Sequence, residues 1–219
     1  KKINLSMDEW NVWYHSAAQD QDIWKKDKWN RALPLLEDVY NFEDALLCGS
    51  ILITLLNNAD RVKIACLAQL VNVIAPIMTR NGGGAWAQTT YWPLYHAGRY
   101  GRGTALRALV HSPVYDCKDF EAVPYLDAAA TLADDGSVTI FAVNRDPQEA
   151  LELSADLRAF GTLTMAEHIV LRHDDVKAVN TEADTDQVKP VAGDLGEPDG
   201  GRLTVTLPAM SWNVLRLKK

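Results

Sequence analysis

Cysteine is scarce in this sequence and shows no pairing pattern. The 219 residues contain three cysteines, Cys48, Cys66 and Cys117, which are far apart and form no C-x-x-C pair. This spacing argues against a zinc knuckle and against a disulfide framework. Cys48 and Cys66 lie within apolar runs, so we expect both to be buried thiols, as in a protein of a reducing compartment.

The sequence also has no excess of positive charge and no long apolar run. Its 22 Lys and Arg residues are outnumbered by 29 Asp and Glu residues, which gives a formal net charge of −7 at pH 7. Nucleic-acid binders need clustered basic side chains, so nucleic acid is not an expected partner. The longest apolar stretch, near residues 45–56, is too short to span a bilayer, and no signal peptide is visible. We expect a soluble, cytoplasmic protein without a membrane partner.

Several motifs of catalytic and metal sites are missing. No G-x-S-x-G nucleophile elbow occurs, and the glycines at 82–84 lack the Lys and Ser or Thr of a phosphate-binding loop. His168 and His173 lie five residues apart, with two aspartates next to His173. Side chains at that spacing do not share a strand face, so we predict no metal site.

Two strand-like runs stand out in the first hundred residues. Residues 3–7 alternate apolar and polar side chains, as in a short strand, and end at Asp8-Glu9. Residues 62–72 (VKIACLAQLVN) form a near-continuous apolar run, which predicts a strand buried on both faces. The sequence opens on Lys1-Lys2 without an initiator Met and enters a strand almost at once. We therefore expect a fragment or a processed chain.

Helical patterns lie between and after these runs. Residues 41–61 predict a buried helix, with Asn41 as its cap and acidic residues in its first turn. Residues 89–100 predict a second helix, in which Pro93 fits the first turn. Residues 17–31 are polar and predict a long loop. Alternating strands and helices indicate a parallel α/β unit, and two strands alone would leave sheet edges exposed, so we expect further strands to come from elsewhere.

The pattern changes after about Gly103 to short strands and turns. Asp134-Asp135-Gly136 predicts a hairpin turn, and residues 176–201 predict an extended surface loop. The second half therefore predicts an antiparallel β-sandwich. The strand-like runs are residues 104–115, 128–132, 137–144, 163–171 and 203–217.

Asp8-Glu9, at the end of the first strand, is the sharpest local signal for chemistry. Functional groups of parallel α/β proteins gather at the carboxyl ends of strands, where loops can vary on a fixed sheet. Trp10 and Trp13 follow at once, and aromatic faces pack well against the C–H surfaces of sugars. Acids also cap helices and pair with Arg, so spacing alone leaves the role of Glu9 open. Asp8 would point to the other face of a regular strand, and we expect it to be structural.

The sequence resembles glycoside hydrolase family 51, the intracellular α-L-arabinofuranosidases, along essentially its whole length. The resemblance is carried by the segments INLSMDEWNVWYH, LLEDVYNFEDALLCGSILITLLNNADRVKIACLAQLVNVIAPI, AWAQTTYWPLYHA, SPVYDCKDFEAVPYLDA, TIFAVNRD and LPAMSWNVLRL.

The resemblance implies an α/β plus all-β fold. Residues 1–103 would be the last two β/α units of a (β/α)₈ TIM barrel, and residues 104–219 a β-sandwich of jelly-roll type. Residues 3–9 and 62–72 would be the seventh and eighth barrel strands. Family members release terminal α-L-arabinofuranosyl residues from hemicellulose-derived oligosaccharides with retention of configuration. Related enzymes are often homo-oligomers, which implies the same for this protein.

The resemblance also implies roles for three residues. Glu9 in DEWN matches the nucleophile, Trp13 matches a residue lining the arabinose subsite, and Gln69 in LAQLVN matches a polar contact to the sugar. The acid/base glutamate of the family follows an Asn on the fourth barrel strand, and no such segment occurs here. Retaining hydrolysis needs two carboxyl groups about 5 to 5.5 Å apart. We therefore expect the isolated chain to be inactive, to need the missing N-terminal barrel segment and to use no metal or organic cofactor.

Three alternatives stay open at this point. The chain could belong to a related barrel glycosidase, such as a β-xylosidase or endoglucanase, with a changed pocket. It could be a non-catalytic carbohydrate-binding module, in which residues 104–219 alone bind sugar. It could also be one piece of a nicked or split enzyme that associates with its other half.

Overall fold

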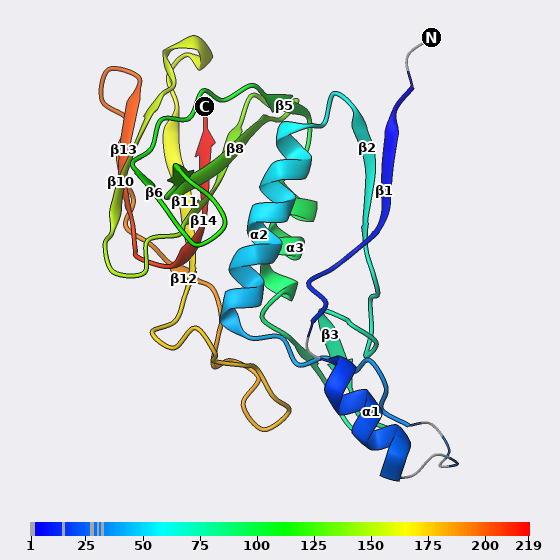
Figure 1. Cartoon of the computed structure of the whole chain (residues 1–219). Coiled ribbons are helices and arrows are strands. Elements are labelled where there is room, and N and C mark those ends of the chain that lie inside the picture. The colour runs from blue at the N-terminus through cyan, green and yellow to red at the C-terminus, as the bar shows by residue number, and fades with distance from the viewer. Residues whose placement is uncertain (1–2, 15, 27–28, 30, 32) are drawn as a thin grey trace.

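The chain is arranged in layers, with a pair of packed helices between a two-stranded parallel sheet and a larger antiparallel sheet (Figure 1). The computed structural model describes residues 3–14, 16–26, 29, 31 and 33–219. The predicted opening at Lys1-Lys2 and the motif residue His15 lie outside these residues. Among the described residues, no helix has the length and apolar character needed to cross a membrane.

Helix α2, Phe42–Asn57, is the central element of the fold. Asn41 caps it as predicted: its side chain accepts a hydrogen bond from the Asp44 backbone, and the Asp44 side chain accepts one from the Asn41 backbone. This capping box satisfies two N–H groups that the first turn would otherwise leave unpaired. The helix ends earlier than the predicted residue 61, since Asn58 closes it.

The N-terminus of α2 is also held by a long loop from the second half of the chain. The backbone N–H groups of Phe42 and Glu43 donate to the carbonyl oxygens of Ala178 and Val176, both at 2.9 Å. Lys177 forms an ion pair with Glu43. Two further orphan donors of the helix are thereby paired, and the loop is fixed to the helix.

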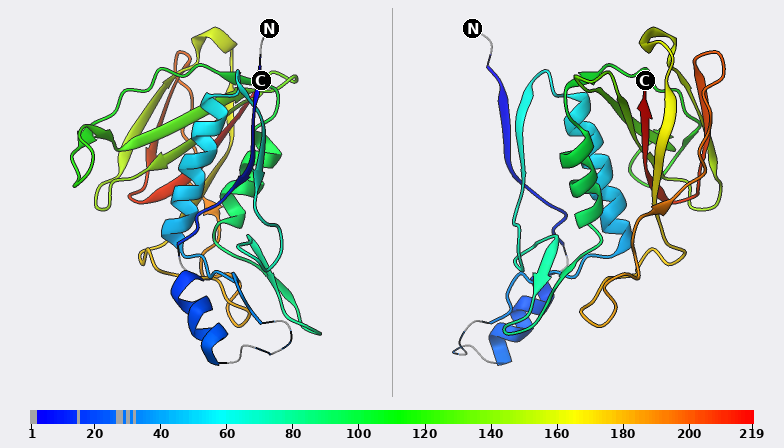
Figure 2. Two further views of the ribbon diagram at one scale, coloured as in Figure 1. Left: turned by 45° about the vertical axis from the view of Figure 1, so that its right-hand side comes forward. Right: turned by 180° about the vertical axis from the view of Figure 1, so that it is seen from behind.

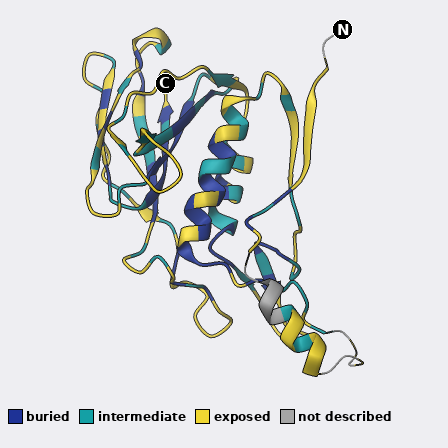
Figure 3. Cartoon of the chain, in the orientation of Figure 1, coloured by how far each residue is buried: buried dark blue, intermediate teal, exposed yellow. Residues whose placement is uncertain are grey.

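Strands β1, Leu5–Trp10, and β2, Val62–Leu67, form the parallel sheet, with Met7 opposite Ala65 and Trp10 opposite Leu67. The prediction that residues 62–72 are buried on both faces is wrong for this chain. The strand is shorter, and its four middle residues are exposed (Figure 3), Cys66 among them. The reason is that, within the described part of the chain, β2 pairs only with β1, which leaves one sheet face and one edge uncovered.

Helices α1 and α3 differ in how well the sequence predicted them. Residues predicted as the loop 17–31 include helix α1, Ser16–Lys26, so that prediction is wrong there. Its sequence, SAAQDQDIWKK, holds good helix formers and no Gly or Pro, and intrinsic propensity outweighed its lack of an apolar face. Helix α3, Tyr91–Tyr100, confirms the prediction for residues 89–100, with Pro93 in its first turn. The hairpin of β3, Ile77–Thr79, and β4, Ala85–Ala87, precedes it.

The second half of the chain forms an antiparallel sandwich. One layer is a six-stranded sheet in the order β12-β11-β14-β9-β8-β5, and the other is the ribbon β10-β13 (Figures 1 and 2). A third pair, β6-β7, forms a small separate hairpin. The bounds are β5 Thr104–Leu106, β6 Val114–Tyr115, β7 Val123–Pro124, β8 Leu126–Leu132, β9 Val138–Asn144, β10 Leu151–Asp156, β11 Thr164–Arg172, β12 Val191–Ala192, β13 Arg202–Leu207 and β14 Ser211–Lys218, with a short 3₁₀ helix at Arg158–Phe160.

The sandwich departs from the predicted runs in three places. The run 203–217 is two strands, β13 and β14, because the chain reverses at Pro208 to Met210, where Met210 has a φ of +46°. The run 104–115 divides into β5 and β6, and strand β10 had not been predicted. The predicted turn at residues 134–136 is confirmed between β8 and β9, with Gly136 at a φ of +80°.

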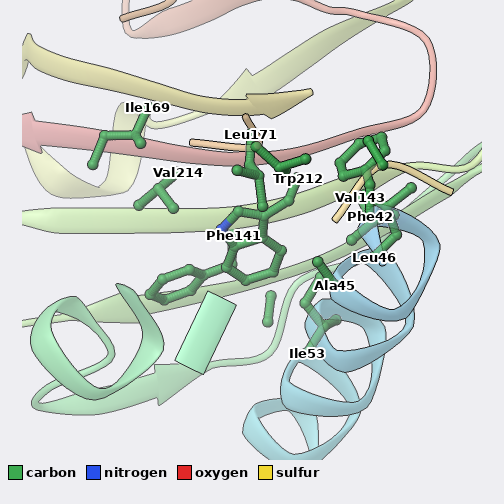
Figure 4. Packing of buried hydrophobic residues seen from close by; sticks show 13 residues of the cluster. Phe42, Ala45, Leu46, Ile53, Phe141, Val143, Ile169, Leu171, Trp212 and Val214 are labelled. Carbon is green, nitrogen blue, oxygen red and sulfur yellow. The ribbon is translucent and has the colours of Figure 1, made fainter. Parts of the chain in front are cut away.

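Strand β9 shows why the layers stay together. Ile140 and Ala142 face a core shared with the ribbon, whereas Phe141 and Val143 face a core shared with α2 (Figure 4). All seven residues of β9 are buried. Because successive residues of a strand point to opposite faces, one central strand serves two cores. The helix layer and the sandwich therefore share a hydrophobic core.

Candidate active site

Glu9 lies one residue before the end of β1, at the edge where both parallel strands end. Its carboxylate is exposed, and it makes no hydrogen bond or ion pair with any described residue. Within the part of the chain that the structure describes, the Glu9 carboxylate therefore neither pairs with an arginine nor caps a helix. This arrangement leaves the carboxylate available for a ligand.

Glu9 and its neighbour Trp10 differ in burial. Trp10 is buried against Cys48 and Leu52 of α2, so it points to the helix layer, as a packing residue does. The pairing of β1 with β2 is irregular between Met7 and Trp10, and Glu9 lies within this irregular stretch. Glu9 is exposed to solvent there, whereas Trp10 is part of the core.

Asn11 joins the ends of the two strands. Its side-chain amide donates to the carbonyl oxygen of Ala68, at 2.5 Å, and to that of Ile74, while its own oxygen accepts from the Val12 backbone at 2.7 Å. The backbone N–H of Ala68 donates to the Trp10 carbonyl at 3.0 Å. The segment after β1 is thus fixed to the segment after β2. Asn11 had not been singled out from the sequence, although its place in the DEWN motif was the available signal.

The two predicted sugar contacts lie in these same segments. Trp13 is 61% exposed, four residues after Glu9, and Gln69 is exposed, two residues after Leu67, the strand partner of Trp10. The Gln69 backbone donates to the Ile74 carbonyl at 3.2 Å. Glu9 is thus in β1, while Trp13 and Gln69 follow the ends of β1 and β2 by three and two residues. An exposed indole, amide and carboxylate in these segments suit a ligand with C–H faces and hydroxyl groups.

Tyr14 connects this edge to helix α2. Its hydroxyl donates to Oδ1 of Asp44, and partial burial together with the Asp44 carboxylate raises the pKa of Tyr14. The hydroxyl therefore stays protonated and able to donate. Asp44 is itself buried and belongs to the capping box of α2.

Cys48, which lies behind this edge, is not an available nucleophile, and the histidines do not form a metal site among the described residues. Cys48 is fully buried behind Trp10, and burial raises the pKa of its thiol to about 12, so it is no thiolate near neutral pH. No group of three or more His, Cys, Asp or Glu side chains that could hold a metal ion occurs among the described residues. His168 is buried with its Nδ1 2.9 Å from the Asp194 carbonyl, and His173 lies in a turn that follows β11.

Comparisons with known proteins give consistent results. The model of the family described as α-L-arabinofuranosidase C-terminal domain matches residues 8–211. An intracellular exo-α-(1→5)-L-arabinofuranosidase of Halalkalibacterium halodurans is 57% identical over 220 residues, and one of Bacillus subtilis is 54% identical over 220 residues. Both alignments cover 100% of this chain but 43% of the relative. The chain therefore spans less than half the length of these relatives.

A solved structure has the same fold. A family 51 α-L-arabinofuranosidase from Bifidobacterium longum superposes with a TM-score of 0.90 at 38% sequence identity. The match covers 100% of this chain and 44% of the solved one.

Proposed function

Because the chain belongs to the family 51 α-L-arabinofuranosidases and matches their C-terminal domain, we propose that it is the nucleophile-bearing part of a retaining α-L-arabinofuranosidase. The observation that carries this proposal is the placement of Glu9. Its exposed carboxylate lies near the end of a parallel strand and bonds to no described residue, and Trp13 and Gln69 lie in the segments that follow the two strands.

We propose a barrel context for the first part of the chain. Residues 1–103 would contribute strands seven and eight of a (β/α)₈ barrel, and residues 104–219 the sandwich domain. The parallel pairing of β1 with β2 supports this, as do the exposed apolar side chains of Leu5, Met7 and Ile64. An isolated pair of strands does not bury such side chains, and six further strands with their helices would cover them. Glu9 would then face the barrel interior.

In this proposal hydrolysis is a double displacement. The Glu9 carboxylate attacks the anomeric carbon, and the bond to the leaving oxygen breaks as a second carboxylic acid protonates that oxygen. The same second group, now a carboxylate, takes a proton from water, which hydrolyses the glycosyl ester and releases Glu9. The second carboxyl group would come from the N-terminal barrel segment, outside this chain. The isolated chain is therefore expected to be inactive.

The roles of Asn11, Trp13 and Gln69 follow from the geometry at the strand ends. Asn11 fixes the two segments to each other, so that Glu9 and Gln69 keep their relative positions. Trp13 would provide an apolar wall for the arabinofuranosyl ring, and Gln69 would hydrogen-bond its hydroxyl groups. A fixed geometry of this kind lowers the entropic cost of reaching the transition state.

The substrate and setting are proposed from the relatives. The two relatives of Halalkalibacterium halodurans and Bacillus subtilis are named for exo action on α-(1→5) linkages and as intracellular proteins. We propose terminal arabinofuranosyl residues of arabinose-containing oligosaccharides as the substrate class, the cytoplasm as the location and a homo-oligomer as the assembly.

The test uses the intact protein that contains this chain and an aryl α-L-arabinofuranoside. Glu9→Gln should lower kcat by at least about 10³-fold, in the range caused by loss of a catalytic nucleophile. Asp8→Asn is the matched control, since it removes the neighbouring carboxylate, which has no proposed role, and should keep most activity. With Glu9→Ala, added azide should displace the aryl group and form an arabinofuranosyl azide of inverted configuration. Unchanged turnover in Glu9→Gln would exclude the nucleophile role.

A panel of aryl glycosides separates the related activities. Aryl β-xylosides and aryl β-cellobiosides should be poor substrates compared with the arabinofuranoside. A preference for either of them would favour the β-xylosidase or endoglucanase alternative. Loss of that activity in Glu9→Gln would then still place the nucleophile at Glu9.

A further inference from the structure

A pocket of about 450 Å³ lies between helix α3 and the edge of the six-stranded sheet formed by β11 and β12. It is on the other side of the helix layer from Glu9. Leu94 and Ala97 of α3 pack with Trp10 toward the parallel sheet, whereas Trp92 and Tyr100 pack toward the sandwich. The volume is in the range of natural small-ligand sites.

The helix side of the pocket is aromatic. Trp92, His96 and Tyr100 follow one another at intervals of four residues, which places them on one face of α3. Neighbouring ring centroids are 6.3 Å apart in both pairs, with interplanar angles of 28° and 16°. Tyr95 adds a fourth ring and is 39% exposed. Rings that are aligned and partly open to solvent offer apolar surface to a flat ligand.

His96 provides a directed hydrogen-bond donor. The indole N–H of Trp212 donates to Nδ1 of His96 at 3.2 Å, so this nitrogen carries no proton. Burial lowers the pKa of His96 to about 4, and the neutral ring therefore holds its proton on Nε2. No described residue accepts a hydrogen bond from Nε2, although His96 is only 3% exposed and forms part of the pocket wall. Nε2 is not among the buried polar atoms without a partner, so it opens to the pocket and can donate to a ligand there.

The charges of the pocket are balanced within the protein. Glu167 forms an ion pair with Arg216 at 2.8 Å, and Asp186 forms one with Lys189 at 3.1 Å. The Arg216 guanidinium also lies over the Tyr100 ring, 4.1 Å from its centroid. An anionic or cationic ligand would meet no uncompensated charge here. A neutral ligand with hydroxyl groups could use the free lone pairs of these carboxylates.

The sheet side of the pocket is held in place by hydrogen bonds. The indole N–H of Trp92 donates to the Val188 carbonyl at 3.1 Å, and the Gly193 backbone donates to the His168 carbonyl at 2.8 Å. A Cβ at position 193 would lie 2.4 Å from the His168 ring, so only glycine allows this close approach. The loop that carries Asp186 and Lys189 is thus fixed to both α3 and β11. A preformed wall lowers the ordering cost of binding.

We propose that this pocket is a second saccharide-binding site, separated from the Glu9 edge by the helix layer. Aromatic rings would pack on the C–H face of one sugar unit, His96 would donate to a hydroxyl oxygen, and Glu167 or Asp186 would accept from hydroxyl groups. Such a site would hold an oligosaccharide near the enzyme while its terminal unit is cleaved elsewhere. The choice of an arabinose oligomer as a probe and the expected binding of a second molecule at the Glu9 edge rest on the proposed function.

The test counts bound oligosaccharide in the intact protein carrying Glu9→Gln, by calorimetry with α-1,5-linked arabinotriose. Two molecules should bind per chain. Ala192→Trp introduces a large side chain at an exposed position of the pocket rim on β12. It should fill the pocket and reduce the number of bound arabinotriose molecules to one per chain. Tyr95→Ala should weaken the second site at least tenfold. Phe120→Ala removes another exposed aromatic side chain, outside the pocket, and should leave both sites unchanged.

Each other result contradicts the proposal. The same number of bound molecules in Ala192→Trp as in its Glu9→Gln parent would exclude a saccharide site in this pocket. Inorganic phosphate that competes for the second site would exclude the neutral ligand. Xylotriose is titrated in parallel, so that saccharide binding is detected even when the arabinose specificity is wrong. Loss of hydrolysis in Glu9→Gln tests the proposed function separately, and the melting temperature shows that each variant is folded.

Discussion

The hydroxyl of Tyr14 lies 3.1 Å from Oδ1 of Asp44 and donates a hydrogen bond to it. This contact connects the segment that follows Glu9 to the capped first turn of α2. The same turn is held from the other side by the loop at residues 176–178. The sandwich and the candidate site are therefore fixed to one helix terminus.

Replacing Tyr14 by Phe should weaken that connection. Loss of one hydrogen bond should lower the free energy of unfolding by about 0.5–1.5 kcal/mol. It should also lower kcat/KM several-fold, since Trp13 and Glu9 lie on the released segment. Urea unfolding and aryl arabinofuranoside kinetics of the intact protein measure both effects. Tyr115→Phe is the control, because the Tyr115 hydroxyl bonds to no described residue. Equal effects of the two substitutions would exclude a special role for Tyr14.

Asn11→Ala should destabilise the strand ends. The change removes the donors to Ala68 and Ile74 and leaves the Ala68 carbonyl oxygen without a described partner, while the Ile74 carbonyl keeps the Gln69 backbone donor, at a cost of about 1–3 kcal/mol. Asn11→Asp should cost at least as much. It keeps the size of the side chain but replaces the donating amide nitrogen by a carboxylate oxygen, which would face the two carbonyl oxygens. Asn4→Ala, whose amide bonds to no described residue, should stay within about 0.5 kcal/mol of the parent. Denaturant unfolding compares the three, and equal stability of the Asn11 and Asn4 variants would contradict the cross-link.

Gly49→Ala should overpack the contact between α2 and the sandwich. A Cβ at this position would lie 2.6 Å from Cε3 of Trp212, and Trp212 is fully buried beside Phe141 (Figure 4). We expect a loss of about 1–3 kcal/mol in the free energy of unfolding. Gly98→Ala, also helical, meets no atom within 4 Å and should be neutral or stabilising by up to about 1 kcal/mol. Thermal unfolding of both variants measures the difference, and a neutral Gly49→Ala would mean that Trp212 can move aside.

Stability should fall in mild acid because of His96. Its folded pKa of about 4 is below the unfolded value near 6.5, so the unfolded state binds more protons between these values. The stabilisation is fully present above about pH 6.5 and is lost as the pH falls toward 4, by about 2 kcal/mol at pH 4.5. His96→Gln should reduce this slope, whereas His111→Gln, at an exposed position, should not. Urea unfolding at pH 7 and pH 4.5 measures the slope. A slope unchanged by His96→Gln would assign the pH dependence to other groups.

Local patterns in the sequence predicted the elements whose signals are local. The capped helix α2, helix α3 with Pro93 and the turn at residues 134–136 are confirmed, since caps, prolines and turn glycines act over a few residues. Long motifs also identified the family, which the comparisons confirm. The sequence further predicted that Glu9, Trp13 and Gln69 lie at one sheet edge, and their catalytic and binding roles stay predictions.

Burial and long-range contacts were decided only by the tertiary structure. The apolar run of β2 predicted a strand covered on both faces. The exposure of β2 depends on the elements that lie beside it, and among the described residues it pairs only with β1. Asn11 bonds to residues 57 and 63 positions away, and His96 bonds to Trp212, 116 positions away. Which face of an element is apolar can be predicted from side-chain periodicity, because that periodicity involves only residues close together in the sequence. The partner of that face depends on packing between distant segments, which no local pattern contains.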